Sequence, residues 1–365
     1  MICITSSSHF PDDERIYHRQ IKSLVKNKKK ILYITRSQKN IDLSNDLLNH
    51  INLDITLSSF LENALSIIIK NNISHLQVHE TNLLPLIKSI KRLEPSVVTI
   101  YDVHEDMKSL YRTFTTRNIF ISEVAIYFRN KKEEYYLKYV DKIILANSTI
   151  KKSSYKNFKK EIYFLENFPQ KKYIRSSIKN KVRGPLIVYH GHLAPERGIS
   201  DLVEAMVEVL KAEPLATLTL LGTFRIESFK KEVTALIKKY KLEDCISVRA
   251  QIPYEEVWGV LRKHAIGVIP FRSNPLTENN TPTKLFEMMA SGLEIVATDL
   301  HPIRYFLNKT IFWATPNQSS SLAESLIQAI KNLEDDSNLN ENLELVNQRY
   351  NWEKIELKYL STFQQ

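Results

Sequence analysis

The stretch TENNTPTKLFEMMASGLEIVAT, residues 277–298, places a helix and a strand on either side of one glycine. Thr281 can accept a hydrogen bond from a free backbone N–H at a helix N-terminus, and Pro282 suits the first helical position. The pattern therefore predicts a helix over about 282–291 that ends at Gly292. The residues that follow, 293–298, are typical of a buried strand, and the rest of the chain repeats this alternation.

The predicted helix has an apolar side of leucine, phenylalanine and methionine, and a polar stripe. Thr283, Glu287 and Ser291 follow one another along the stripe, with Lys284 beside it. Glu287 is therefore either a solvated surface carboxylate or a ligand-binding one. This segment alone favours the surface alternative, because most helical glutamates face water.

Length and composition indicate a two-domain globular protein. The chain has 365 residues, of which 43% are hydrophobic and 25% charged. Its apolar runs are shorter than a membrane span, and its first strand follows no signal-peptide pattern. Cys3 and Cys245 show neither metal-ligand nor disulfide spacing, so we expect a reduced, cytoplasmic protein.

The positive charge is concentrated in the first half of the chain. Residues 1–180 hold 30 Lys and Arg against 18 Asp and Glu, whereas residues 181–365 hold 21 against 23. Such an imbalance fits nucleic acid, an anionic membrane surface, an acidic substrate or simply a lysine-rich composition. No nucleic-acid-binding motif accompanies it, so we expect no nucleic-acid partner.

Strand-like and helix-like runs alternate through both halves of the chain, which predicts an α/β protein with two Rossmann-like, doubly wound parallel-sheet domains facing across a cleft. The expected boundaries are an N-terminal domain at 1–168, a basic linker at 169–184, a C-terminal domain at 185–350 and a crossing C-terminal helix at 351–365. The expected strands lie near 2–6, 31–35, 74–78, 97–101, 142–146, 185–190, 216–221, 244–248, 266–270, 293–298 and 311–313. The expected helices lie near 14–27, 60–71, 82–92, 119–138, 148–158, 199–211, 226–240, 254–263, 282–291 and 319–332, with Asn351 capping the last one.

The first loop of the C-terminal domain has the features of a phosphate site. In VYHGHLAPERGISDLVEAM, residues 188–206, Gly191 permits a tight turn and Arg197 lies just before a helix. A guanidinium and the unpaired N–H groups of a helix N-terminus both attract an anion. The spacing fits neither a Walker A loop nor a dinucleotide fingerprint, so a structural turn with a surface arginine is the alternative.

Polar side chains also emerge from two strands of the N-terminal domain. YDVHED ends one strand with Asp102, His104 and Glu105, and QVHE ends the previous one with His79 and Glu80. Polar groups at the carboxyl ends of buried parallel strands favour a ligand site over a buried core histidine. A metal site is a weaker alternative, because three-ligand spacing is lacking.

The first turn, TSSSHFPDDERIYHRQIKSL, is rich in serine where a dinucleotide-binding protein has glycine. Asp13 and Arg15 could contact an anion or hydroxyl groups, or Asp12 or Asp13 could cap the helix. The sequence lacks G-x-S-x-G, H-E-x-x-H and C-x-x-C, which argues against hydrolase, metalloprotease and thioredoxin functions.

Together these segments resemble the retaining nucleotide-sugar glycosyltransferases of family 4, in the branch that assembles polysaccharides and other glycans, which have the two-domain GT-B fold. DDERIYHRQIKSL and YDVHED are similar to motifs of that branch, and GHLAPERGISDLVEA is similar to the phosphate loop G-R-L-x-x-E-K-G. IPFRSNPLTENNTPTKLFEMMASGLEIVAT is similar to the donor segment that ends in P-x-K-x-x-E-x-x-A-x-G-x-P-V-V-A. YNWEKIELKYL matches the closing helix.

The resemblance implies specific roles. Glu287 would bind the ribose hydroxyls of the donor, Arg197 would hold the pyrophosphate, and His104 would approach the donor sugar. The implied catalytic residues are Arg197, His104 and Lys284. The implied donor-binding residues are Glu287, Asn279, Thr281, Thr283, Gly191, His192, Arg249, Gln251 and Ile252. Asp13, Arg15, Asp102 and Glu105 are acceptor-side candidates.

Four positions depart from the family pattern. Asn279 stands where the first glutamate of E-x7-E usually binds sugar hydroxyls, and His192 replaces the arginine of the phosphate loop. Ala250 stands where glycine is common, and Glu294 where proline is usual. The first two positions bear on which donor is used and how firmly its pyrophosphate is held.

The resemblance implies a retaining, metal-independent transfer without cofactor, from a nucleotide sugar (UDP-sugar before GDP-sugar) to a glycan or a lipid-linked glycan in cell-surface polysaccharide assembly. Two alternatives are a nucleotide-sugar 2-epimerase of GT-B fold and a non-catalytic partner. The basic, aromatic stretches IFISEVAIYFRNKKEEYYLKYV and IKKSSYKNFKK further suggest a peripheral location on the inner, anionic face of the cell membrane.

Overall fold

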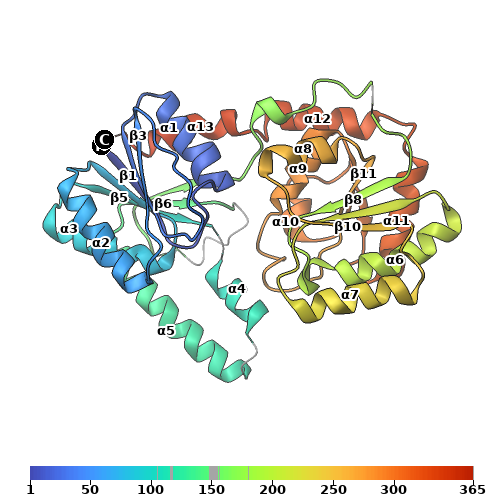
Figure 1. Ribbon diagram of the computed structural model, residues 1–365, viewed down its shortest axis with the longest axis horizontal. Helices are drawn as coiled ribbons and strands as arrows, with labels where there is room; N and C mark the ends of the chain where they lie inside the picture. Colours follow the sequence, from blue (N-terminus) through green and yellow to red (C-terminus); the bar gives the residue numbers. More distant parts are fainter. Residues whose placement is uncertain (105, 116–117, 148–154, 156, 180, 365) are drawn as a thin grey trace. The chain divides into compact units, whose positions relative to one another are not determined.

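The computed structural model describes residues 1–104, 106–115, 118–147, 155, 157–179 and 181–364. It divides the chain into two units. Unit 1 comprises Met1–Asn167 with Ile355–Gln365, and unit 2 comprises Phe168–Lys354. Each unit is a twisted sheet with helices packed against it (Figure 1).

Unit 1 is built on a seven-stranded sheet in the order β3-β2-β1-β4-β5-β6-β7, and every strand pairing in it is parallel. The order reverses between β1 and β4, which is the point where open α/β sheets bind ligands. Its strands are β1 (Ile2–Ser6), β2 (Ile31–Thr35), β3 (Leu48–Asn52), β4 (His75–Val78), β5 (Val98–Val103), β6 (Lys142–Leu145) and β7 (Glu161–Phe164).

The helices of unit 1 cover both faces of this sheet (Figure 1). Cys3, Leu32 and Leu76 point from one face into a core that Phe60 and Ile87 fill from the helices. Asp13 caps the first helix, which starts as a π-helix and continues as an α-helix. The helices are η1 (π, Glu14–Ile21), α1 (Lys22–Lys26), α2 (Leu57–Lys70), η2 (3-10, Thr81–Leu83), α3 (Leu84–Leu93), α4 (Met107–Phe114) and α5 (Ile119–Leu137).

Unit 2 repeats the same winding on a six-stranded parallel sheet in the order β10-β9-β8-β11-β12-β13. Its order reverses between β8 and β11. The strands are β8 (Leu186–His190), β9 (Thr217–Leu221), β10 (Ile246–Arg249), β11 (Ile266–Ile269), β12 (Glu294–Thr298) and β13 (Phe312–Ala314). The two doubly wound sheets confirm the predicted α/β fold class.

The helices of unit 2 form two groups, α6 with α7 and α11, and α8 with α9 and α12 (Figure 1). They are η4 (3-10, Lys171–Tyr173), η5 (3-10, Pro195–Arg197), α6 (Ile199–Ala212), α7 (Glu227–Lys239), α8 (Tyr254–Leu261), α9 (Thr283–Ser291), α10 (His301–Arg304), α11 (Ser319–Lys331) and α12 (Ser337–Gln348). The last helix, α13 (Trp352–Ser361), ends in unit 1. Asn351 Oδ1 accepts from the backbone N–H of Lys354 at 3.1 Å, which confirms the predicted cap.

The structure contains several elements that the sequence did not predict, among them the short α10. β3 and β7 were not expected, because both are edge strands whose residues are largely only partly buried. α4 and the asparagine-rich α12 were also not expected, and α12 is held by burying Leu339 and Leu343. The helix expected near 148–158 lies largely outside the described residues.

Candidate functional site

The loop after β8 brings two glycines into backbone conformations that other residues rarely adopt. Gly191 has φ +108°, and a Cβ there would lie 3.0 Å from Lys284 Nζ. Gly198 has φ +67°, and a Cβ there would lie 1.7 Å from the carbonyl oxygen of Pro270. The loop therefore passes close to two neighbouring segments and delivers the chain to the first turn of α6.

Two cations lie beside this loop. Lys284 Nζ donates a hydrogen bond to the Tyr189 hydroxyl at 2.9 Å and lies 4.9 Å from the centre of the Phe271 ring. The Arg197 guanidinium lies 4.5 Å from the centre of the same ring. Burial, and then the charge of Arg197, hold the pKa of Lys284 well below its usual value. Arg197 Nε also lies 3.7 Å from Glu196 Oε1, so one carboxylate faces two positive groups that share one aromatic ring.

Glu287 lies one turn further along α9 and is only 5% exposed, so the surface alternative is wrong. Its Oε2 is 3.3 Å from Nε2 of His190, the last residue of β8. Burial and the nearby Lys284 lower the pKa of His190 to about 3, so the imidazole is neutral at physiological pH. The carboxylate of Glu287 therefore lies buried at the carboxyl edge of the sheet.

The segment before α9 differs in detail from the prediction. The helix starts at Thr283, and the N-cap position belongs to Pro282 and not to Thr281. Proline has no side-chain acceptor, so the N-cap residue forms no side-chain hydrogen bond with the backbone N–H groups in the first turn of α9. Asn279 Nδ2 donates to the carbonyl oxygen of Pro275 at 2.7 Å, which fixes the amide within its own turn.

The other predicted donor residues follow the ends of neighbouring strands. The carbonyl oxygen of His192 accepts from the Tyr189 hydroxyl at 2.7 Å, and burial lowers the pKa of the His192 imidazole to about 4. Arg249 ends β10, two strands from β8, and its carbonyl oxygen accepts from the N–H of Gly222. Gln251 Oε1 accepts from the Thr223 hydroxyl at 3.4 Å, and Ile252 follows, partly exposed.

In unit 1, the predicted residues Arg15 and Asp102 are paired with each other. Arg15 Nε and Nη2 donate to the two oxygens of Asp102 at 3.1 and 2.9 Å, and both side chains are buried. Gln20 Nε2 adds a third hydrogen bond to Asp102 at 2.6 Å. Asp13 Oδ1 accepts from the backbone N–H groups of Arg15 and Ile16, so its carboxylate caps the first helix. Asp13 therefore stabilises the start of the first helix. Arg15 and Asp102 form a buried ion pair near the point where the strand order reverses.

His104 belongs to a row of histidines at the same edge. Its Nε2 is 2.8 Å from Nδ1 of His79, and its ring centre is 4.5 Å from that of His9. Burial lowers the pKa of His79 to about 4 and holds the pKa of His104 well below its usual range. Neutral rings can form this hydrogen bond, because one nitrogen then donates and the other accepts.

The serine-rich turn is filled by a carboxylate of the protein itself. Glu80 accepts hydrogen bonds from the Ser6 hydroxyl at 2.6 Å, from the backbone N–H groups of Ser7 and Ser8, and from His9 Nδ1 at 2.8 Å. The turn, for which an anion, hydroxyl groups or a helix cap were the alternatives, thus holds the carboxylate of Glu80.

His79, Asp102 and His104 offer ligand atoms that all lie within 4.8 Å of one another. However, both oxygens of Asp102 already accept from the Arg15 guanidinium. A divalent ion there would have to displace or face that cation, so the cluster fits an ion poorly. Glu105, the remaining acceptor-side candidate, lies outside the described residues.

A comparison with protein families matches residues 170–345, almost the whole of unit 2, to the family described as glycosyl transferases group 1. Residues 170–345 form a group 1 glycosyl transferase domain. The protein is accordingly a glycosyltransferase, a transferase of class EC 2.4. A comparison with the sequences of curated proteins gives no match.

Solved glycosyltransferase structures share the fold over the whole chain. A sucrose-phosphate synthase from Thermosynechococcus elongatus has a TM-score of 0.79 at 17% identity, covering 99% of this chain and 98% of the other. A glycosyltransferase from Rickettsia africae has a TM-score of 0.71 at 14% identity, covering 100% and 98%. HepE from Anabaena, in complex with UDP and glucose, has a TM-score of 0.73 at 13% identity, covering 99% and 98%. These likenesses establish the GT-B fold of the glycosyltransferase.

Several neighbours of the predicted residues were not foreseen in the glycosyltransferase. Tyr189 and Phe271 surround Lys284 from two strand ends, and Gln20 joins the Asp102 network. Tyr189 and Phe271 could have been suggested by the sequence, because both lie at the ends of predicted strands. Gln20 is separated from Asp102 by 82 positions, and local pattern gives no means of linking them.

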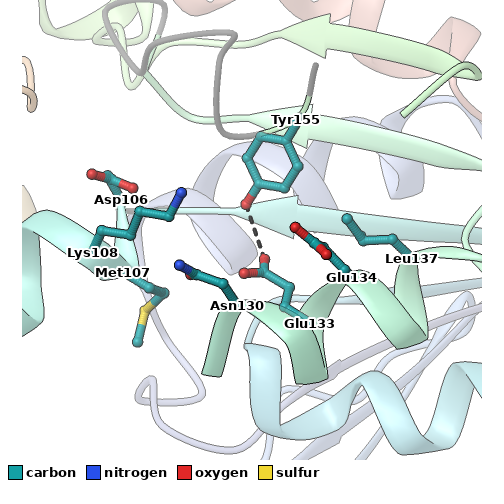
Figure 2. Close-up of a pocket in the computed structure, with 8 residues that line it drawn as sticks. All are labelled: Asp106, Met107, Lys108, Asn130, Glu133, Glu134, Leu137 and Tyr155. Atoms are coloured by element: carbon teal, nitrogen blue, oxygen red, sulfur yellow. Dashed lines mark hydrogen bonds between the residues drawn. The ribbon is translucent and has the colours of Figure 1, made fainter. Parts of the chain in front are cut away.

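A further pocket of the glycosyltransferase lies in unit 1, between α4 and α5 (Figure 2). The Tyr155 hydroxyl donates to Glu133 Oε1 at 3.1 Å, and burial raises the pKa of Glu133. Asp106, Lys108 and Glu134 also line it. It is mainly acidic, so it is not a second phosphate site. Among the helices that the structure describes, none has the length and apolarity to cross a membrane.

Proposed function

We propose that the protein is a retaining glycosyltransferase of family 4 that moves a sugar from a nucleoside diphosphate sugar to a glycan or lipid-linked glycan in cell-surface polysaccharide assembly. UDP-sugar is the favoured donor and GDP-sugar the second choice. The structures of Anabaena HepE contain UDP, UDP with glucose, or UDP-glucose, which supports the choice of uridine.

One observation carries the proposal, namely the pair of cations beside the glycine loop of unit 2. Lys284 Nζ and the Arg197 guanidinium lie over the same ring, and Lys284 Nζ lies 3.0 Å from the Cβ position of Gly191. The first turns of α6 and α9 begin here, after Gly198 and Pro282, neither of which has a capping side chain. Two helix N-termini without side-chain caps, beside two cations, suit a pyrophosphate.

The same groups would promote the reaction by stabilising the departing nucleoside diphosphate. Negative charge grows on the phosphate oxygen as the bond to the sugar breaks, and preorganised positive groups lower the energy of that transition state. The departing oxygen would take the proton of the acceptor hydroxyl as that hydroxyl attacks from the same face. No protein base is needed, and metal independence is part of the proposal. His104 keeps its predicted catalytic role within it.

Glu287 is proposed to accept hydrogen bonds from the ribose hydroxyls. A carboxylate is an acceptor only, and two neighbouring hydroxyls present two donors to it. Its neighbour His190 is neutral, so the carboxylate is not neutralised by an ion pair from that side. Arg249, Gln251 and Ile252, at the end of β10, are proposed to border the base.

Calorimetric titration with UDP and UDP-glucose tests the donor site. We expect Arg197→Ala and Glu287→Ala each to weaken binding by about tenfold or more, the loss of a charge-assisted hydrogen bond. Lys230→Ala and Glu256→Ala, which remove exposed charges on α7 and α8, serve as matched controls and should bind like the wild type. Full donor binding by folded Arg197→Ala and Glu287→Ala would refute the assignment.

A non-catalytic partner of a glycan-assembly enzyme is the second candidate, because the Asn279 amide is tied to Pro275 within its own turn. A panel of nucleotide sugars separates the candidates through slow donor turnover. Released nucleoside diphosphate identifies the transferase, a new sugar epimer identifies a 2-epimerase, and no product identifies the partner. A lipid-linked acceptor would also place the enzyme at the cytoplasmic face of a membrane.

A further inference from the structure

The segment of α4 and α5 has an unusual concentration of exposed apolar side chains. Of the sixteen large hydrophobic residues that are exposed in the described part of the chain, eight fall between residues 107 and 135. Figure 1 shows α5 extending away from the sheet of its own unit. A soluble protein rarely exposes such a patch without a partner for it.

Five of these residues form one face of α5. They occupy positions i, i+1, i+4, i+7 and i+8, which a helix places on one side. We call them the outer face: Phe120, Ile121, Val124, Tyr127 and Phe128. The opposite side of the helix contains Ser122 and Ile126, which are 3% and 4% exposed and contact the rest of the unit. The packing of α5 against its unit therefore does not use the outer face.

Towards the end of the helix the outer face becomes aromatic and cationic. Lys131, Tyr135 and Lys138 continue the same side of α5. Lys131 Nζ lies 5.8 Å from the centre of the Tyr127 ring, and Lys138 Nζ lies 5.8 Å from that of Tyr135. Such side chains cover apolar surface with their stems and hold the charge at its margin.

The acidic residues of the segment do not cancel this charge. Residues 106–138 contain seven Lys and Arg against four Asp and Glu. Glu123 is held by Arg112 at 2.7 Å, Glu134 by Lys131 at 2.8 Å, and Glu133 points into the unit towards Tyr155 (Figure 2). Lys132 and Lys138 form no ion pair within the part of the chain that the structure describes, and their charges favour an anionic surface.

We propose that the outer face of α5 docks the enzyme on an anionic lipid bilayer. Its apolar side chains would enter the boundary between headgroups and acyl chains, with Lys131, Lys132 and Lys138 among the headgroups. A second copy of the chain is a poorer partner, because a symmetric contact through this face would bring like charges together. The docking stands apart from the transfer reaction, although it would supply the proposed lipid-linked acceptor.

Sedimentation with vesicles tests this surface. Wild type should bind vesicles of phosphatidylcholine with phosphatidylglycerol more tightly than vesicles of phosphatidylcholine alone. Phe120→Ser/Phe128→Ser should lower the partition coefficient about tenfold or more, because two apolar side chains no longer enter the lipid. Leu215→Ser is the matched control, since Leu215 is 82% exposed in unit 2 and Phe120 is 83% exposed.

A second pair of variants tests the electrostatic part. Lys132→Gln/Lys138→Gln should lose the preference for anionic vesicles while keeping the weaker binding to neutral ones. In Phe120→Trp, the tryptophan emission should shift to the blue when anionic vesicles are added, since the side chain leaves water.

Three results would overturn the proposal. In the first, the wild type does not sediment with anionic vesicles, and in the second, the Phe120→Ser/Phe128→Ser variant sediments like the wild type. The third is a wild type that is a dimer in solution and a variant that is a monomer. The last would assign the face to a second copy. Calorimetry with UDP-glucose on the same variant keeps this outcome separate from the proposed function, because the substitutions lie in unit 1 and should leave donor affinity unchanged.

Discussion

At the scale of single residues, Lys284 shows how burial prepares a group for its ligand. Its ammonium is held by one hydroxyl, that of Tyr189, and by two aromatic rings, and it shares its surroundings with Arg197. The nearby carboxylates of Glu287 and Glu196 raise the pKa of Lys284 but do not offset its burial, so an incoming phosphate would relieve the remaining cost.

Replacing Lys284 with methionine keeps the length of the side chain and removes its charge. We expect kcat for sugar transfer or donor hydrolysis to fall about 10²- to 10³-fold, as for other single groups that stabilise a developing anion. Steady-state kinetics with UDP-sugar measures this. Lys230→Met, at an exposed position on α7, should retain full activity, and an equal loss in both variants would contradict the role of Lys284.

Glu294 is a buried carboxyl group whose ionisation lowers the stability of the folded protein. It is fully buried at the start of β12, with Asn332 and Asn338 as its nearest amide partners at 3.5 Å. Burial raises its pKa from 4.5 to about 7. The native state therefore binds more protons than the unfolded state between these two values, and stability falls as pH rises through this window.

Glu294→Gln should remove that pH dependence. Below pH 4.5 the wild type keeps the contribution of this group in full, and above pH 7 it has lost it. The variant should then exceed the wild type in free energy of unfolding by on the order of 2–3 kcal/mol at pH 8, and differ little at pH 4. Urea unfolding at the two pH values measures the difference, and parallel profiles for the two proteins would contradict it.

At the scale of elements, the connection from β8 to α6 depends on a close approach of backbones. Gly198 occupies the N-cap position of α6 in the left-handed region, with the Pro270 carbonyl where a Cβ would be. The carbonyl belongs to the segment after β11, so this glycine sets the spacing of two neighbouring loops at the switch point of the sheet.

Gly198→Ala should destabilise the protein by about 2 kcal/mol or more, because it adds both a strained φ and a steric overlap. Thermal unfolding measures the loss, and donor binding should weaken with it. Gly259→Ala is the matched control, since Gly259 lies exposed within α8 with open space around it. This control should be stabilised by about 0.5–1 kcal/mol. Equal effects would show that the approach to Pro270 is unimportant.

At the scale of the whole molecule, unit 1 is completed by the end of the chain. Tyr359 is fully buried there, and its hydroxyl donates to Gln77 Oε1 at 3.2 Å. Gln77 in turn contacts Gln20 and His79, so residues 355–365 support the network around Asp102. The C-terminal segment is thus part of the core of the first unit.

Tyr359→Ala should destabilise unit 1 by about 3–5 kcal/mol, whereas Leu357→Ala, at a position 75% exposed, should change stability by no more than about 0.5 kcal/mol. All three tryptophans, Trp258, Trp313 and Trp352, belong to unit 2. In the variant, circular dichroism should therefore show an early transition that tryptophan fluorescence does not. Coincident transitions would contradict this division.

The sequence by itself determined the α/β class and most elements of both sheets, because buried parallel strands and amphipathic helices leave strong local patterns. It failed at the edge strands β3 and β7, where half-exposed residues blur the pattern, and at the polar α12, which tertiary packing holds in place. Through spacing and resemblance it also predicted Arg197 and Lys284 as catalytic residues and Glu287 as a donor-binding residue.

Only the tertiary structure decided how these residues are surrounded. Glu287 proved buried beside His190, Asn279 proved tied to Pro275, and Arg15 proved bound to Asp102 across 87 positions of sequence. Local periodicity reports which side of a helix is apolar, whereas burial and partners depend on chain segments that meet only when the sheet is assembled.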